Sequence, residues 1–139
     1  MSKTFKISQF ATNAQKEKEG AWVDAGGGLR LKIARLGNSD YEEHLRKLSK
    51  PYSRQIRMNT IENEVLETVI RKATAKYILL DWENLTDDDD KPIPYSEGKA
   101  YELLTEYRDF MKMVTELAGE VELFRQDDFK EVEGNSESD

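Results

Sequence analysis

The segment Leu79-Leu80-Asp81-Trp82-Glu83-Asn84-Leu85-Thr86-Asp87-Asp88-Asp89-Asp90-Lys91-Pro92-Ile93-Pro94-Tyr95-Ser96 is rich in aromatic and acidic residues and separates two apolar runs with helical spacing. Four successive carboxylates repel one another and stay near water, whereas Trp82 and Tyr95 are large rings that lower the free energy by leaving water. We therefore expect a solvated loop that is pinned at both ends. Its like charges and its two prolines also predict that the preceding helix ends here.

Two helices are predicted on the N-terminal side of this loop. The first begins at Ser39, which has capping-box spacing to Glu42, and it ends at Pro51. The second begins within 59–62 and carries a broad apolar stripe, so it should be central to the core. The stripe consists of Ile61, Val65, Leu66, Val69, Ile70, Ala73, Tyr77 and Leu80.

Two more helices are predicted on the C-terminal side. Ser96 can cap a helix whose apolar residues are Tyr101, Leu103 and Leu104. The next helix runs from Arg108 to Arg125 and presents a second broad apolar face. That face consists of Phe110, Met113, Val114, Leu117, Val121 and Phe124. Residues 126–139 are acidic and are expected to form a disordered tail.

A β-hairpin is predicted before the helices. The runs 21–24 and 29–36 flank three glycines, and the second run alternates apolar with polar residues. The glycines do not follow the strand, G-x-x-x-x-G-K-[ST] and helix order of a phosphate-binding loop, so they indicate a turn. Residues 1–19 are polar and rich in lysine, and they indicate a weakly ordered arm or one short strand.

The sequence thus predicts a mainly α fold of the α+β class. An N-terminal β-hairpin is followed by about four α-helices in one compact domain over residues 20–125. A chain of 139 residues with 37% hydrophobic residues can bury one modest core. No apolar run is long enough to cross a membrane and the first residues lack a signal-peptide core, so we expect a cytoplasmic protein that does not bind membranes.

Charge is distributed unevenly along the chain. Residues 1–76 carry 15 Lys and Arg against 9 Asp and Glu, whereas residues 77–139 carry 6 against 19. Clustered Lys and Arg in the first half could bind nucleic acid, but the net charge of −7 opposes association with phosphate. We expect no nucleic-acid partner, and we expect the two halves to complement each other within the fold.

Few residues are suited to catalysis or to metal binding. The chain has no cysteine and a single histidine, His44, which excludes disulfides, thiolate chemistry and most transition-metal sites. The four aspartates do not match a calcium loop, because Pro92 takes the position of the required glycine and Gly98 that of the required glutamate. No G-x-S-x-G nucleophile elbow is present. We expect no enzyme activity, no metal site and no cofactor.

Several short segments occur in an order that is typical of one protein family. They are 20–23, 31–38, 48–52, 80–84, 92–96, 100–104 and 108–110, and they extend over about residues 20–125. In this order they resemble tail assembly chaperones of long-tailed, siphovirus-type bacteriophages. The resemblance implies a small, largely helical, non-enzymatic protein that is made in the host cytoplasm during virion assembly and is absent from the mature virion.

The resemblance also implies the partners. Such chaperones coat the long helical tape-measure protein, keep its apolar faces from aggregating and bring major tail-tube subunits to it, and the chaperone itself can form a homo-oligomer. Two other functions are compatible with the residues. One is an acidic regulatory protein that responds to cations or nucleic acid through the four aspartates or the basic half, and the other is a minor structural protein of the virion.

Candidate partner-binding residues lie on the helix that begins at Arg108. They are Phe110, Met111, Met113 and Leu117. Methionine is unbranched and polarisable, so Met111 and Met113 can adapt to varied partner side chains. The alternative is that these residues pack into the core, as apolar stripes on helices usually do.

Overall fold

The structure is a computed structural model that describes residues 3–124. A three-stranded antiparallel sheet of order β1-β2-β3 consists of β1 (Ala21–Gly26), β2 (Leu29–Ile33) and β3 (Leu79–Glu83). Val23 lies opposite Leu31, and Leu31 lies opposite Trp82. Gly27 and Gly28 join β1 to β2 with positive φ angles of 62° and 86°, a conformation that glycine adopts without steric cost. The β-hairpin prediction is confirmed.

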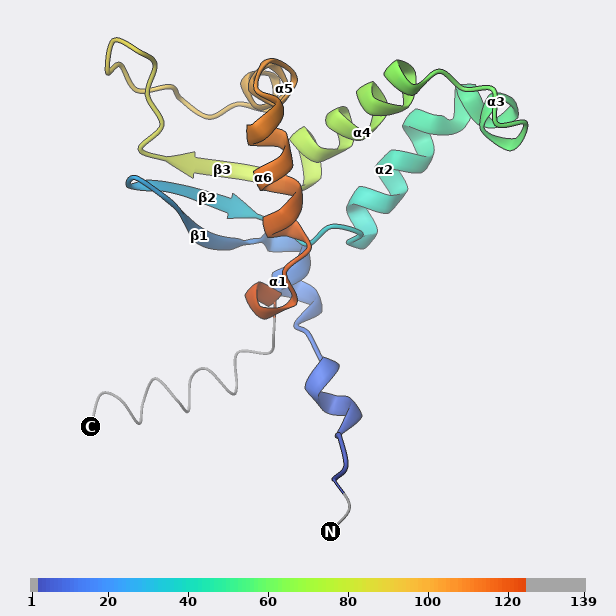
Figure 1. The fold of residues 1–139 in the computed structure, drawn as a ribbon, viewed down its shortest axis with the longest axis horizontal. Coiled ribbons are helices and arrows are strands. Elements are labelled where there is room, and N and C mark those ends of the chain that lie inside the picture. Colours follow the sequence, from blue (N-terminus) through green and yellow to red (C-terminus); the bar gives the residue numbers. More distant parts are fainter. Residues whose placement is uncertain (1–2, 125–139) are drawn as a thin grey trace.

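There are four longer helices, of which α6 crosses beside the sheet while α2 and most of α4 extend away from it (Figure 1). Helix α4 contacts α2, α5 and β3, so it is central to the helical part, and α6 contacts α5 and β2. The helices are α2 (Ser39–Ser49), α4 (Asn63–Tyr77), α5 (Glu97–Glu106) and α6 (Arg108–Ala118). Short helical segments are η1 (Ile7–Phe10), α1 (Ala14–Glu19), η2 (Lys50–Tyr52), α3 (Ser53–Arg57) and η3 (Val121–Phe124). The expected mainly helical α+β fold is confirmed.

One core joins the sheet to the helices. Its sheet residues are Leu31, Ile33, Leu79 and Trp82, and they are buried against Ala73, Leu103, Leu104, Val114 and Phe124 from the helical segments. Fully burying a Leu, Ile, Val or Phe side chain contributes roughly 1.5–3 kcal/mol. Residues from both halves of the chain therefore form a single hydrophobic cluster.

The third strand, β3, was not predicted from the sequence. The apolar stripe of the second predicted helix was expected to continue to Leu80, but α4 ends at Tyr77. In β3 the register shifts, because Lys32 lies opposite Asp81 while Ile33 lies opposite Leu79. The extra residue, Leu80, places both Leu79 and Trp82 in the core although they are three positions apart. A bulged strand can therefore imitate helical spacing in the sequence.

Some helix boundaries also differ from the predicted ones. The first predicted helix is capped by Asn38 and not by Ser39: the Asn38 side chain accepts a hydrogen bond of 3.0 Å from the backbone N–H of Tyr41. The Ser96 cap is confirmed, with a bond of 3.0 Å from the N–H of Lys99. The helix expected from Arg108 ends at Ala118, and a separate turn follows to Phe124. Residues 3–19 contain helical segments and no strand. The predicted acidic tail, 126–139, lies outside the described residues.

Candidate partner-binding groove

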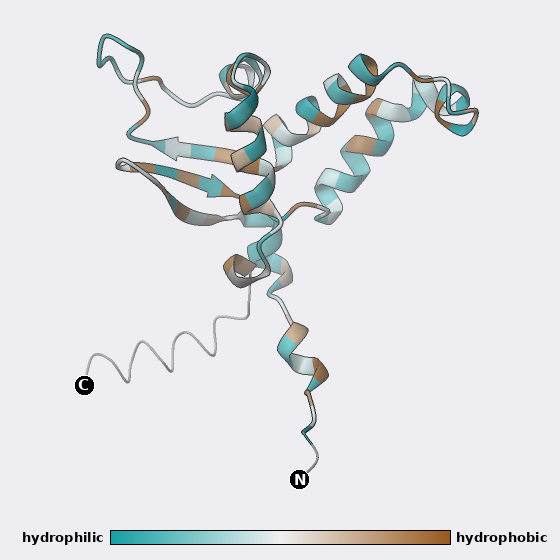
Figure 2. Ribbon diagram, viewed as in Figure 1, coloured by the Kyte–Doolittle hydropathy of each residue, from teal (hydrophilic) through white to brown (hydrophobic). Residues whose placement is uncertain are grey.

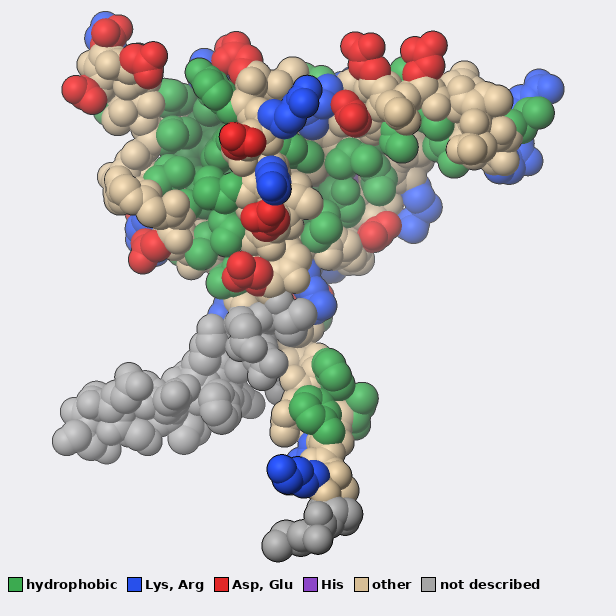
Figure 3. All heavy atoms as spheres, in the orientation of Figure 1, with side chains coloured by type: hydrophobic (Ala, Val, Ile, Leu, Met, Phe, Trp, Pro, Cys, Tyr) green, Lys and Arg blue, Asp and Glu red, His purple; other side chains and the backbone are tan. Residues whose placement is uncertain are grey.

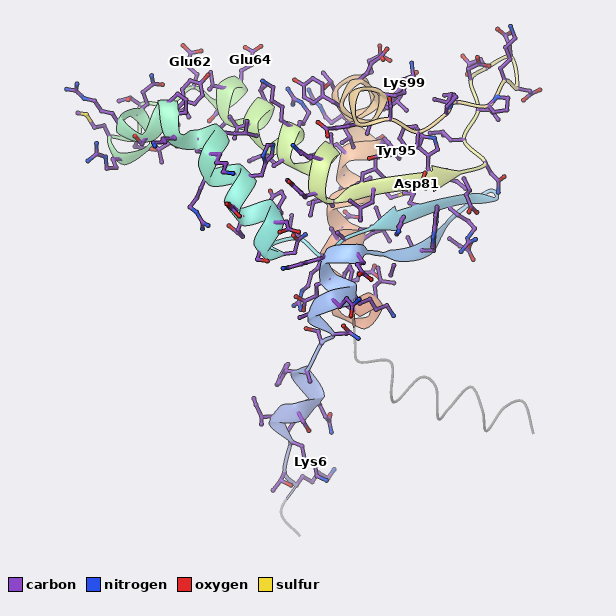
Figure 4. The ribbon with its side chains drawn as sticks, turned by 180° about the vertical axis from the view of Figure 1, so that it is seen from behind. Lys6, Glu62, Glu64, Asp81, Tyr95 and Lys99 are labelled. Atoms are coloured by element: carbon purple, nitrogen blue, oxygen red, sulfur yellow. The ribbon has the colours of Figure 1, made fainter. Side chains whose placement is uncertain are left out.

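The aspartate loop, defined as residues 84–96, is pinned by two aromatic residues. The indole N–H of Trp82 donates a hydrogen bond of 2.7 Å to the carbonyl of Ile93. The hydroxyl of Tyr95 donates one of 2.7 Å to the carbonyl of Leu79. The sequence predicted a loop pinned at both ends, and these bonds confirm it. Figure 4 shows Tyr95 close to β3, on the same side as Asp81.

The tip of the loop is held by hydrogen bonds within the loop. The Asp87 carboxylate accepts hydrogen bonds from the N–H groups of Asp89 and Lys91, at 2.8 and 3.0 Å. Further in, the N–H of Ile93 donates to the carbonyl of Leu85, and Thr86 pairs with Pro92 across the loop. These contacts form a small hairpin-like excursion, and its apolar side chains can therefore keep a fixed position.

Burial, together with the nearby negative charges of Glu97 and Asp81, raises the pKa of Tyr95 to about 12. The phenol therefore stays neutral near pH 7 and keeps the proton that it donates to Leu79. The hydrogen bond from Tyr95 to Leu79 is thus insensitive to pH in the physiological range.

An apolar groove of about 540 Å³ lies between the aspartate loop and the junction of α5 and α6. This volume is within the range of about 300–1,000 Å³ that is typical of ligand sites. Its floor consists of Leu29, Leu85, Ile93, Leu103, Tyr107 and Phe110. We call this site the acidic groove, because its charged lining residues are Asp87, Asp88, Glu106, Asp109 and Lys99.

The charge of the groove favours a basic ligand. Four of the lining residues carry carboxylates, and the single ammonium among the lining residues, Lys99, lies 3.3 Å from the Glu102 carboxylate. Lys99 projects from α5 in Figure 4. Low-dielectric walls strengthen the field of such a cluster, so an apolar segment with flanking Lys or Arg is the complementary ligand.

The four partner-binding residues that the sequence predicted are only partly brought together here. Phe110 lines the groove, whereas Met111, Met113 and Leu117 do not. All four are half-buried and pack against the core, next to the buried Val114 and Ala118. Sequence reasoning missed most of the floor. The available signal was the pair of apolar residues, Leu85 and Ile93, placed on either side of the four aspartates.

A second apolar surface lies on an N-terminal arm, defined as residues 3–11. Phe5, Ile7 and Phe10 are 63%, 81% and 66% exposed, and the two phenylalanine rings lie 5.2 Å apart. Figures 2 and 3 show that the N-terminal segment is a projection that extends away from the body of the protein and carries apolar side chains. An exposed apolar cluster of this kind is typical of an interaction site.

The base of the arm is fixed to the body. The guanidinium of Arg35 lies 2.7 Å from the Glu17 carboxylate, which also accepts a hydrogen bond from the Thr12 hydroxyl. Together the Thr12 bond and the Arg35 charge lower the pKa of Glu17. The N–H of Asn13 donates to the carbonyl of Phe124 at 2.8 Å. The arm therefore leaves the body in a defined direction.

The other described parts of the chain are less suited to form a functional site. Among residues 3–124 no three His, Cys, Asp or Glu side chains group in a way that could hold a metal ion. His44 stacks edge-on against Tyr77, and burial together with the nearby Lys76 charge lowers its pKa. None of the helices in this part of the chain has the length and apolarity needed to cross a membrane.

Comparison with known proteins gives a family. A family model described as YdaY prophage protein matches residues 36–135. This range begins just before α2 and includes β3, the aspartate loop, α5 and α6, so it contains most of the groove. No curated protein matches the sequence, and no solved structure matches it.

Proposed function

Because this chain belongs to the YdaY prophage protein family and is thus of bacteriophage origin, we propose that it is a tail assembly chaperone of a siphovirus-type phage. In this role it binds the tape-measure protein transiently and brings major tail-tube subunits to it. It acts in the host cytoplasm by protein binding alone, without catalysis, cofactor, nucleic acid or membrane, and it leaves before the virion is complete.

The position of the resembling segments supports this proposal. Residues 80–84 belong to β3 and the start of the aspartate loop, residues 92–96 form the end of that loop, and residues 100–104 and 108–110 belong to α5 and α6. Within these segments Ile93, Leu103, Asp109 and Phe110 line the acidic groove. Part of the resemblance to tail assembly chaperones therefore lies at a surface that is shaped to hold a partner.

The observation that carries the proposal is the apolar floor of the groove inside its acidic rim. A tape-measure protein is a long helical rod whose apolar stripes must stay out of contact with one another until the tail forms. An amphipathic helix binds by placing its apolar face in a groove, and charged residues at the rim select the flanking charge. A groove of this size binds one short segment, so many copies along one rod would gain strength from multivalency.

Co-expression with the tape-measure protein of the same prophage tests the function. We expect the tape-measure protein to be soluble and to co-purify with the chain, and to aggregate when the chain is omitted. A tape-measure protein that is equally soluble without the chain would contradict the proposal. Finding the chain in purified virions would instead support a minor structural protein, and stoichiometric calcium or DNA binding by calorimetry would support the regulatory alternative.

A further inference from the structure

We infer that the N-terminal arm of one copy of this chain docks in the acidic groove of a second copy. The two surfaces are complementary in chemistry. The arm exposes Phe5, Ile7 and Phe10, and the groove has an apolar floor that is open to solvent. Moving exposed apolar side chains into such a floor releases about 25 cal/mol for each Å² that leaves water.

Charge complementarity selects the arm as the occupant. Residues 3–11 contain Lys3 and Lys6 and no acidic residue. Both lysines are exposed, and Figure 4 shows Lys6 on the projection, far from the sheet. The groove carries four carboxylates against one ammonium. A basic apolar segment and an acidic apolar groove attract each other at a distance and exclude water on contact.

The geometry favours contact between copies. The contacts of Thr12 and Asn13 fix the base of the arm beside Glu17 and Phe124. In Figure 1 the arm leaves from there and points away from the aspartate loop. The arm and the groove are different surfaces, so their contact is heterologous, and copies add head to tail into a ring or an open filament.

Two properties follow from a contact of this size. A short arm buries only part of the roughly 1,200–2,000 Å² of a stable interface, so association is reversible and depends on protein concentration. Salt weakens it, because screening reduces the attraction between exposed charges. The inference goes beyond the chaperone proposal and does not rest on it. If both hold, an arm and a client segment compete for the same groove.

Sedimentation velocity of the full chain over a concentration series tests the inference. An arm variant, Phe5→Ser/Ile7→Ser/Phe10→Ser, removes the apolar ligand at side chains that are mostly exposed. A groove variant, Asp88→Lys/Glu106→Lys, reverses two exposed rim charges, and lysine at position 106 suits the C-terminus of α5. We expect the wild type to associate with rising concentration, and each variant to remain monomeric over the same series.

Mixing the two variants gives the sharpest result. The arm variant keeps a functional groove and the groove variant keeps a functional arm, so the mixture should form a one-to-one complex that neither variant forms alone. The control Ile56→Ser/Met58→Ser removes exposed apolar residues near α3 and should associate like the wild type.

Three results would overturn the inference. The wild type could remain monomeric at every concentration, which would also be the outcome if the arm folded into its own groove. The arm variant could associate as strongly as the wild type, which would place the contact elsewhere. The mixed variants could fail to form a complex although circular dichroism shows both to be folded.

Discussion

Trp82 and Tyr95 meet edge to face, with ring centroids 4.9 Å apart and ring planes at 68°, and each donates a hydrogen bond across to the other's segment. Trp82 in β3 donates to Ile93 in the loop, and Tyr95 in the loop donates to Leu79 in β3. The pair joins the aspartate loop to the core through two reciprocal bonds and one ring contact. The position of one wall of the acidic groove therefore depends on it.

Tyr95→Phe tests this pairing. The substitution keeps the ring contact and removes the bond to the carbonyl of the buried Leu79, so we expect a loss of about 1–2 kcal/mol in the free energy of unfolding in urea. Trp82→Phe and the double variant complete a mutant cycle, whose coupling energy should exceed about 0.5 kcal/mol. Tyr107→Phe, at an exposed tyrosine, should change stability little. Additive effects of the two pairing substitutions would contradict the reciprocal arrangement.

The raised pKa of Tyr95 predicts a loss of stability at high pH. Its pKa is about 12 in the folded protein and 10.0 in the unfolded reference, so the folded state holds the proton more tightly. The resulting stabilisation is complete below pH 10 and is lost as the pH rises through about 12. Urea unfolding at intervals over this range should show a decline that is smaller in Tyr95→Phe. An identical decline in both proteins would contradict the assignment to Tyr95.

Glu17→Gln tests how the arm is fixed. The change removes the negative charge that Arg35 contacts at 2.7 Å, so the amides of α1 should exchange their hydrogens faster. The pKa of Glu17 is lowered in the folded protein, so its contribution is present above pH 4.5 and is lost as the pH falls through the folded value. At acidic pH the exchange rates of the α1 amides in the wild type should therefore approach those in the variant. Lys18→Gln, on the same short helix, is the control and should leave exchange unchanged.

Gly20 and Gly98 form a matched pair for backbone strain. Gly20 has a φ of +87°, and a Cβ there would lie 3.0 Å from Leu80 Cδ1 and 3.1 Å from the carbonyl oxygen of Ile33. Gly20→Ala should therefore cost about 1–3 kcal/mol. Gly98 lies in α5 with no atom near its missing Cβ, so Gly98→Ala should stabilise by about 0.5–1 kcal/mol. Thermal unfolding of both variants measures their stabilities relative to the wild type. Equal changes in stability would contradict the assignment of backbone strain to position 20.

Much of the fold could be predicted from local patterns. The glycines at the hairpin turn and the Ser96 cap are signals that depend on neighbouring residues, and the structure has both features. The strand β3 could not be predicted in this way. Its bulge at Leu80 gives Leu79 and Trp82 the spacing of a helix, and only pairing with β2 distinguishes the two.

The candidate site was less accessible to sequence reasoning. Its floor comes from β2, the aspartate loop, α5 and α6, so tertiary packing brings its residues together. Phe110 was found because it belongs to a helical stripe. Tyr107, in contrast, lies between α5 and α6, where no periodicity marks it, although it is one of the most exposed large rings of the described chain.

A comparison of binding constants tests whether the acidic groove holds the tape-measure protein. Tyr107 in the groove and Met58 near α3 are similarly exposed, at 58% and 62%. Serine at either position removes apolar surface without changing charge. At position 107, serine is also a favourable N-cap for α6. Calorimetric titration of a soluble tape-measure segment measures the affinity of each variant.

We expect Tyr107→Ser to weaken binding by about tenfold or more, because exposed aromatic residues at the centre of an interface carry much of its energy. Met58→Ser should stay within about twofold of the wild type. Full affinity in Tyr107→Ser, or an equal loss in both variants, would contradict the assignment of the groove as the partner-binding site.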